Sequence, residues 1–479
     1  MRRAFLSAIS LTLAVGCAPP LPNVKPDVNV PQHWSQATSV TATDAPVVDL
    51  RGWWRAFGDS QLDRLVDAAL AENLDVQQAQ QRIVAARALQ RRERAAYRPS
   101  LSAKTESNPT PDSSASYFQA GFDAQWELGL FGRSESDGKI ARADFESAEV
   151  DLQAARASVV AEVARTYVEL RGADQRIAAF ERIVEAQREK LGFTKTREHA
   201  QLASALDVAR VESDLAQAET AAIEPRLTIT RSRQQLALLS GRAESIALSD
   251  GAQPTLGDLR IEQTPADLLR TRPDIRRAEF AVLKAAGEAG LARADLYPRL
   301  GLGGALTYSS RISGTTRLGN TNSIFSIGPV IDIPLFDWGA RRAVVDARDA
   351  ALQAALLGYR QAVLEGVAEV EIALASLEQQ RLRVSSDTRS LAAQKNASAA
   401  TATLVHLQLA DGIDNSDAKI ALDQAAIESE QASEARNLAF IALYKALGGA
   451  PLADMTQTTA APGDSQGQAI DARPSEPQP

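Results

Sequence analysis

The sequence predicts a mainly α-helical fold with a transmembrane β-barrel contribution, in which long coiled helical hairpins and four β-strands per protomer are internally duplicated. Three observations support this prediction. The same order of motifs occurs twice, about 200 residues apart. Apolar residues follow a heptad spacing over runs far longer than an ordinary soluble helix. Between these runs, short segments alternate strictly between apolar and polar residues, as membrane-spanning strands do.

The first 16 residues predict a lipoprotein signal peptide. Arg2 and Arg3 precede an apolar run, residues 4–15, that is too short to cross a bilayer as a helix. The run ends at Gly16, directly before Cys17, which is the only cysteine. A small residue before a cysteine resembles the bacterial lipobox, whose cysteine carries S-diacylglycerol and an N-palmitoyl chain. We therefore expect lipid attachment at Cys17, where two acyl signals would give a stable anchor. An ordinary signal peptide with a chance cysteine is the alternative.

The remaining chain divides into two repeats with flexible ends. Residues 17–52 are rich in Pro, Asn, Ser, Thr and Val, which predicts a lipidated, extended tether. The repeats occupy residues 53–241 and 265–451, and residues 242–264 link them. Residues 452–479 have almost no bulky apolar side chain, which predicts a disordered tail. No further segment has the apolar length of a transmembrane helix.

Each repeat predicts a helix, a β-hairpin, a long helix, a turn and a returning helix. The first helix opens at Asp59 and Ser60, which are good N-cap residues. The long helix starts near Gly138 and has about 50 residues, or roughly 75 Å at 1.5 Å per residue. Its counterpart runs from Ala340 to about residue 394. Pro225 should interrupt the returning helix of the first repeat. A soluble coiled-coil hairpin would explain the helices but not the strands.

The strands carry the membrane signal. From residue 118 to 128 every even position is apolar and every odd position is polar or glycine, over the length of a transmembrane strand. A shorter partner precedes it, and a second hairpin pairs residues 300–310 with 324–333. The alternation predicts that one face of the sheet contacts lipid, through Phe118, Phe122, Trp126, Leu302, Leu306, Tyr308, Phe325 and Ile327. A soluble β-sandwich with one wet face is the alternative.

Four strands cannot close a barrel that spans a bilayer. Open strand edges in hydrocarbon leave backbone groups without hydrogen bonds, and each such group costs several kcal/mol. Known barrels begin at about eight strands. The chain must therefore share its barrel with copies of itself, and two, three or four copies would each give an allowed strand number.

Four motifs resemble the TolC-like outer-membrane factors, specifically the OprM- and NodT-like lipoproteins that serve resistance-nodulation-division (RND) efflux pumps. They lie at residues 53–59 (WWRAFGD), 272–279 (RPDIRRAE), 335–339 (LFDWG) and 444–449 (YKALGG). The resemblance extends over nearly the whole mature chain. It implies a homotrimer that forms one α/β tunnel, anchored in outer membrane lipid, with a long periplasmic extension. It also implies two partners, a periplasmic adaptor (membrane fusion protein) and an inner-membrane RND pump.

The resemblance further implies a periplasmic gate near the second turn. Asp417 falls where such proteins place a gate aspartate, and Asp411 and Asp414 lie close to it in sequence. Three copies of this cluster would form a negative ring that favours cations. The stretch from Gly412 to Asp417 is interpreted as about four residues shorter than its counterpart in the first repeat. Aspartates are also common in turns, which is the alternative explanation.

Enzyme chemistry finds no support in the sequence. His33, His199 and His406 are far apart and lack metal-ligand spacing, and no phosphate-binding loop or nucleophile motif occurs. The net charge of −8 argues against nucleic-acid binding. We therefore expect no enzyme activity, no cofactor and no metal.

The expected function is a passive exit duct for drugs or other small molecules, as the outer membrane channel of a tripartite efflux pump. Two alternatives remain from the sequence: the outer-membrane exit of a type I secretion system, and a structural periplasmic lipoprotein without a pore.

Overall fold

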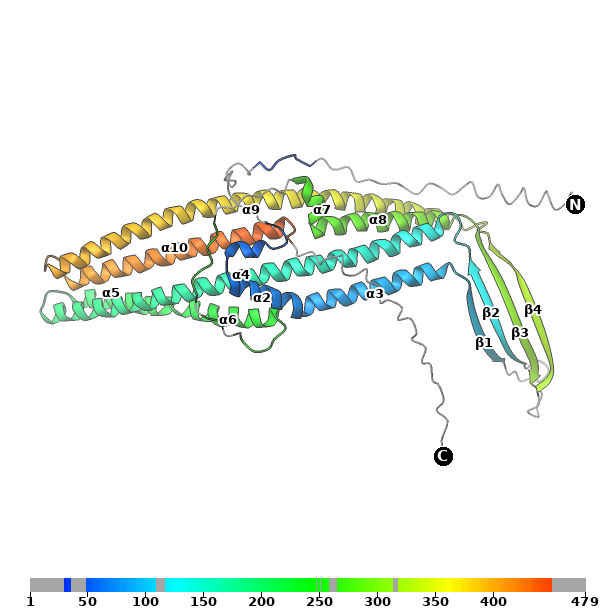
Figure 1. Ribbon diagram of the computed structural model, residues 1–479, viewed down its shortest axis with the longest axis horizontal. Helices are drawn as coiled ribbons and strands as arrows, with labels where there is room; N and C mark the ends of the chain where they lie inside the picture. Colours follow the sequence, from blue (N-terminus) through cyan, green and yellow to red (C-terminus); the bar gives the residue numbers. More distant parts are fainter. Residues whose placement is uncertain are drawn as a thin grey trace, which may run out of the picture.

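The computed structural model describes residues 30–35, 49–108, 117–246, 248–249, 251–257, 265–312 and 318–449. The predicted lipid-attachment residue Cys17, most of the tether and the C-terminal tail lie outside these residues. Long helices run side by side along the molecule, and a four-stranded sheet lies at one end, bent away from the helix axis (Figure 1).

Both repeats contain the predicted order of elements. The first consists of η3 (Trp53–Phe57), α2 (Ser60–Glu72), α3 (Leu74–Ala96), β1 (Ser100–Asn108), β2 (Tyr117–Glu127), α4 (Arg133–His199), α5 (Ala205–Ala221) and α6 (Ile223–Leu239). The second consists of η4 (Pro265–Asp267), α7 (Leu268–Thr271), α8 (Pro273–Ala294), β3 (Arg299–Ile312), β4 (Leu318–Asp332), α9 (Ala340–His406) and α10 (Gly412–Ala446).

The first helix is interrupted, where the sequence predicted a continuous one. Asn73 ends α2 and caps α3, because its side-chain oxygen accepts from the amides of Asp75 and Val76 at 2.9 and 3.2 Å. Its side-chain amide also donates to the Leu239 carbonyl at the end of α6, at 2.9 Å. One buried asparagine therefore satisfies the ends of two helices and joins them.

The long helices exceed the predicted length. Each of α4 and α9 has 67 residues, which is about 100 Å at 1.5 Å per residue. The first begins at Arg133 rather than near Gly138, and the second continues to His406 rather than ending near residue 394. Both begin after a glycine in the left-handed region, Gly132 with φ 81° and Gly339 with φ 86°. Because L residues rarely adopt this φ, the glycines fix where each strand turns into a helix.

The two tips have equal length, so the expectation of a shortened second tip is wrong. From helix end to helix start, the first tip runs from His199 to Ala205 and the second from His406 to Gly412, with the same separation. A glutamine has positive φ at the same place in both, 57° and 58°. Both returning helices open with a capping box. Residues 199–203 (HAQLA) and 406–410 (HLQLA) match at four of five positions, so the two tips align without a gap.

The predicted interruption of the returning helix is confirmed. The helix breaks at Ala222, between α5 and α6, and Pro225 is the third residue of α6. Proline has no amide hydrogen and its ring clashes with the preceding turn, which accounts for the break. The equivalent helix α10 has no proline and runs unbroken for 35 residues.

The strands form one antiparallel sheet in the order β1-β2-β3-β4. Strands β3 and β4 are longer than predicted and extend into the expected loop between them. The hydrophobic core lies in the helical body, where Trp53 stacks on Tyr444 at 5.9 Å between ring centroids and Phe440 packs edge-on against Trp53. None of the helices in the described ranges combines the length and apolar composition needed to cross a bilayer.

Candidate functional site

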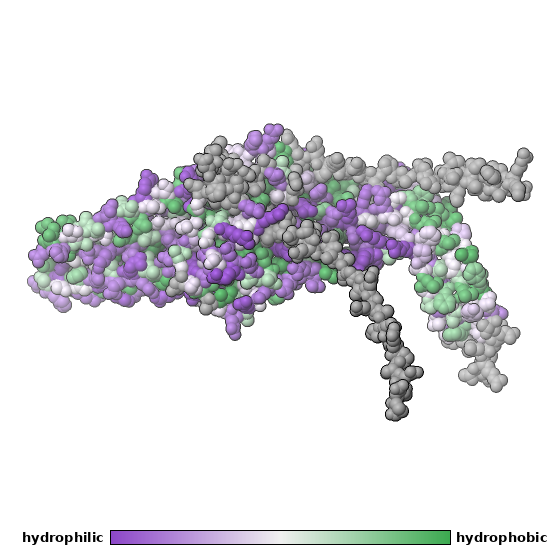
Figure 2. Space-filling model, viewed as in Figure 1, coloured by the Kyte–Doolittle hydropathy of each residue, from purple (hydrophilic) through white to green (hydrophobic). Residues whose placement is uncertain are grey.

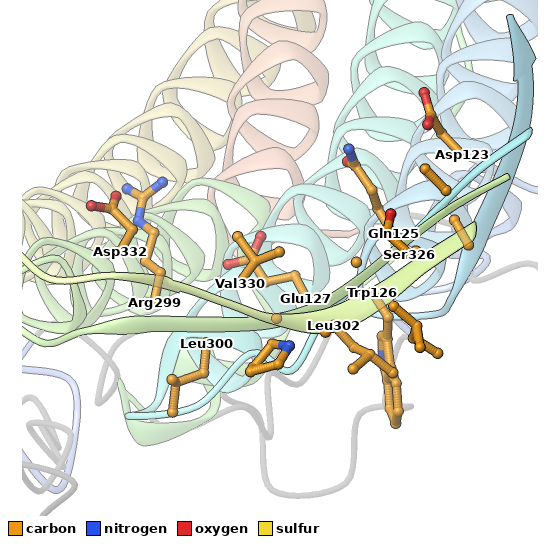
Figure 3. A pocket seen from close by; sticks show the side chains of 18 residues that line it. Asp123, Gln125, Trp126, Glu127, Arg299, Leu300, Leu302, Ser326, Val330 and Asp332 are labelled. Atoms are coloured by element: carbon orange, nitrogen blue, oxygen red, sulfur yellow. The ribbon is translucent and has the colours of Figure 1, made fainter. Parts of the chain in front are cut away.

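The strand register gives the sheet two faces of opposite character. Phe122 pairs with Leu306, and Leu306 pairs with Phe325, so these three side chains share one face. Asp123 pairs with Ala305, and Ala305 pairs with Ser326, so these three residues share the other face. In Figure 3, Asp123, Gln125, Glu127, Arg299 and Asp332 extend from the side of the sheet opposite Trp126, Leu300 and Leu302. The alternation in the sequence therefore becomes a physical separation of apolar and charged surface.

The structure brings all eight residues predicted to contact lipid onto the apolar face. Their positions in the register agree: even-numbered residues in β2 and β3 and odd-numbered residues in β4. Most of these side chains are exposed, among them Phe122, Phe325 and Ile327. Figure 2 shows hydrophobic side chains gathered over the sheet, whereas the middle of the helical body is largely hydrophilic. An exposed apolar surface of this kind marks a membrane or interaction site.

The polar face borders a shallow pocket of about 670 Å³ at the base of the sheet (Figure 3). Charges of both signs occur on this face. Lys104 pairs with Asp123 at 3.0 Å, and Arg133 pairs with Glu127 at 3.6 Å. These side chains are ordered by ion pairs and still reach solvent, so this face can border an aqueous passage but offers no built site for one ligand.

The opposite end of the molecule carries the predicted gate residues. Asp411 is the N-cap of α10, and Asp414 completes the capping box by accepting from the Asp411 amide. Asp411 also pairs with Arg197 of α4 at 3.0 Å, and Asp417 pairs with Lys190 of α4 at 2.7 Å. All three aspartates lie at the same tip, but in the single chain Asp411 and Asp417 each form an ion pair with a basic residue of α4.

These two pairs belong to a row of ion pairs between α4 and α10. The others are Glu189 with Lys419 at 2.8 Å, Arg182 with Asp423 at 2.7 Å, and Arg176 with Glu434. Burial raises the pKa of the Glu434 carboxyl, and the charge and hydrogen bond of Arg176 offset only part of this effect. The row follows the two helices from the tip toward the body, so the tip of α10 is held against α4. Sequence analysis missed it, because its partners are more than two hundred residues apart.

The motif at residues 272–279 has a structural role in this chain. Arg272 is buried, is the N-cap of α8, and donates to the Ala446 carbonyl at the end of α10 at 2.6 Å. It also pairs with Asp274 at 2.7 Å and with Glu369 of α9 at 2.6 Å. Burial alone would raise the pKa of Asp274, but the hydrogen bonds and charge of Arg272 outweigh it and hold that pKa below its usual value.

The structure leaves further apolar side chains uncovered where the sheet joins α9. Leu335, Phe336 and Trp338 are largely exposed, and the rings of Phe336 and Trp338 lie 4.7 Å apart. The motif at residues 335–339 contained these residues, but no pattern in it indicated that they lie on an outer surface. Within the described ranges, no three His, Cys, Asp or Glu side chains come together as a metal site.

The chain is similar to known proteins over most of its length. The family described as outer membrane efflux protein matches residues 65–242 and 264–449. The chain is 30% identical over 467 residues to outer membrane protein OprJ of Pseudomonas aeruginosa, with 93% of this chain and 95% of OprJ covered. It is 30% identical over 360 residues to nodulation protein T of Rhizobium leguminosarum bv. viciae, with 74% of each covered. The solved outer-membrane channel OprN superposes with a TM-score of 0.77 and 28% identity, over 90% of this chain and 99% of OprN.

Proposed function

Because the chain belongs to the outer membrane efflux protein family, we propose that three copies of it join into one duct that carries small molecules out of the periplasm. The chain is the outer membrane channel component of a tripartite efflux pump. The observation that carries the proposal is the four-stranded sheet with one apolar and one charged face, since it has two open edges.

The three copies would complete the barrel that one copy cannot close. A sheet whose edge strands β1 and β4 are unpaired is unstable in the hydrocarbon of a bilayer, because each edge exposes a row of backbone N–H and C=O groups without hydrogen-bond partners. Pairing β4 of one copy with β1 of the next removes both edges. The apolar face would then contact outer membrane lipid, and the face with Asp123, Glu127 and Arg299 would line the water-filled interior. Acyl chains on Cys17 would add a second attachment.

The helical end would form the periplasmic part of the duct. Three tips around one axis would bring Asp411, Asp414 and Asp417 from each copy toward the centre, where they would narrow the opening and attract cations. A duct of this kind has no energy source of its own. We therefore propose that a periplasmic adaptor binds along the helical tips and that an inner-membrane RND pump drives export.

Single-channel recording tests the duct. The purified lipoprotein should be trimeric in detergent by light scattering and should give discrete, cation-favouring conductance steps in planar bilayers. A chain that stays monomeric and inserts into no bilayer would overturn the proposal, as the pore-free structural lipoprotein predicts.

The gate assignment has its own matched test. Asp414 and Asp207 are the N3 residues of the two capping boxes, one at each tip, so the change to asparagine weakens the same helix cap in both. Asp414→Asn combined with Asp417→Asn should raise conductance and weaken cation preference, because the ring loses charge. Asp207→Asn should leave both properties unchanged. Equal effects of the two changes would show that capping, rather than charge at a constriction, controls the opening.

A further inference from the structure

The chain contains its own template for the contact between copies. Elements α4 and β2 of the first repeat pack against α8 and β3 of the second, and we call this contact the inner seam. Their equivalents by duplication are α9 and β4 on one side, and α3 and β1 on the other. These four elements lie at the two opposite edges of the chain (Figure 1). A neighbouring copy would bring them together, and we call that contact the outer seam.

The duplication is regular enough to transfer contacts residue by residue. From β2 onward the second repeat follows the first by 207 residues, as 339 minus 132 shows for the glycines before α4 and α9. Before that point the separation is 199, as 299 minus 100 shows for the first residues of β3 and β1. The hairpin registers agree, because Ser100 pairs with Gln125 and its equivalent Arg299 pairs with Asp332.

We propose that copies of the chain join through an outer seam that repeats the inner seam, with Leu335 against Leu101, Leu357 against Val84, and Trp338 stacked on Arg98 of the next copy. The proposal rests on the proposed trimeric duct and specifies its register. Each of the three contacts follows from one contact within the chain.

The sheet contact follows from the hydrogen bond that the Leu128 amide donates to the Leu300 carbonyl, at 3.1 Å. Adding 207 and subtracting 199 converts this pair to Leu335 and Leu101. In the single chain Leu335 is 89% exposed and Leu101 is 73% exposed. Both lie on the apolar side of the sheet by the transferred register, so each would cover the other.

The helix contact follows from a small buried cluster on the inner seam. Val150 of α4 is fully buried against α8, with Leu283 packed beside it. The equivalent residues are Leu357 of α9, which is 66% exposed, and Val84 of α3, which is 59% exposed. Leu357 and Val84 are thus apolar at the positions equivalent to the buried residues of the inner seam, although nothing in the single chain covers them. Two exposed aliphatic residues at equivalent places on both halves of one contact are explained by burial between copies.

The third contact lies where strands turn into helices. Phe131 stacks on Tyr297 across the inner seam, with ring centroids 5.2 Å apart and planes 16° apart. The equivalents are Trp338 and Arg98, both exposed in the single chain. Trp338 has the same left-handed φ as Phe131, 56°, so its Cβ leaves the backbone at an equivalent turn. An arginine over an indole replaces one ring stack by a cation–π contact, for which tryptophan is the best partner.

Charge complementarity supports the same register. On the inner seam Gln125 pairs with Gly303. The transferred pair is Asp332 with Lys104 of the next copy. Opposite charges directly across two antiparallel strands stabilise their pairing. A shift of the register by one residue would put Asp332 and Lys104 on opposite faces of the sheet, where they could not pair.

Disulfide trapping tests the register in the full-length lipoprotein, whose only native thiol is at Cys17. Leu335→Cys with Leu101→Cys should give covalently linked trimers on mild oxidation of outer membranes. The control, Leu335→Cys with Ala103→Cys, uses a residue on the same face but two places away, too far for an unstrained bond. We expect at least tenfold less linked product. More product from the control pair would overturn the proposed register.

A double substitution cycle tests the stacked contact. Trp338→Ala, Arg98→Ala and the double variant should each lower the temperature of trimer dissociation by the same amount, because either change removes the whole contact. Additive losses would overturn the Trp338–Arg98 assignment. Light scattering and conductance of the unmodified chain test the trimeric duct independently of the outer seam. A conducting trimer that links only through the control pair would overturn the outer seam alone. A monomer without conductance would overturn both proposals.

Discussion

The N-caps of two equivalent helices, an asparagine and an arginine, satisfy equivalent backbone carbonyls with different side chains. Asn73 begins α3 and donates to the Leu239 carbonyl, and Arg272 begins α8 and donates to the Ala446 carbonyl. The two carbonyls are themselves equivalent. Each N-cap therefore ties the start of one helix to the last turn of a returning helix. Arg272 adds ion pairs with two carboxylates, so it joins three helices where Asn73 joins two.

Removal of Arg272 is expected to destabilise the helical body. Arg272→Ala leaves a buried carbonyl and the Glu369 carboxylate without their partner, and loss of such charged hydrogen bonds costs about 2–3 kcal/mol. Arg277→Ala, one turn further along the same helix, removes an exposed pair with Asp151 that is worth about 0–1 kcal/mol. Thermal unfolding followed by circular dichroism should show a clear drop for the first variant and almost none for the second. Equal drops would mean that α8 tolerates loss of its cap.

At the scale of elements, the returning helices show how one residue divides a helix. Pro225 corresponds to Ala432 by the spacing of 207 residues, and Ala432 is fully buried in the unbroken helix α10. The rest of α5 and α6 matches α10 in length. The proline therefore accounts for the break at Ala222, and the second repeat shows the helix that would form without it.

Exchange of these two residues is expected to exchange the behaviour of the helices. Pro225→Ala should join α5 to α6 and slow hydrogen exchange of the amides around Ala222. Ala432→Pro should break α10, with a cost of about 3 kcal/mol or more, because it removes a hydrogen bond and places a ring against the preceding turn. Hydrogen exchange with mass spectrometry measures both effects. If Pro225→Ala leaves exchange near Ala222 unchanged, packing against α4 rather than the proline sets the break.

The sequence predicted elements wherever a short pattern decides them. The alternation within residues 118–128, 300–310 and 324–333 was enough to place eight side chains on one face, because the period of a strand is fixed. Heptad spacing predicted the long helices but not the full extent of the second, since residues 394–403 are all polar or alanine. The break at Asn73 and the row of ion pairs from Arg176 to Arg197 depend on partners far away in sequence, which no local pattern contains.

At the scale of the whole molecule, most exposed apolar surface lies where a single chain is incomplete. The sheet face, the Leu335–Trp338 segment and the outer sides of α3 and α9 all expose apolar side chains. The three surfaces are accounted for by two environments, lipid on the sheet face and a second copy at each edge. The folded chain is thus one part of a larger assembly, and the apolar residues exposed at its edges are explained by contact with neighbouring copies.

The two sheet faces give a prediction for the assembled molecule from adjacent residues. Phe325 and Ile324 are both exposed in the single chain, but the register puts them on opposite faces. Phe325→Arg would place a charge toward hydrocarbon, which costs about 2–4 kcal/mol near the middle of the bilayer, so the amount of trimer in outer membranes should fall. Ile324→Arg would place the same charge toward the aqueous interior, so assembly should persist while cation preference declines. Membrane fractionation and bilayer recording distinguish the two. Loss of assembly with Ile324→Arg and none with Phe325→Arg would reverse the orientation of the sheet and, with it, the assignment of the surface that lines the duct.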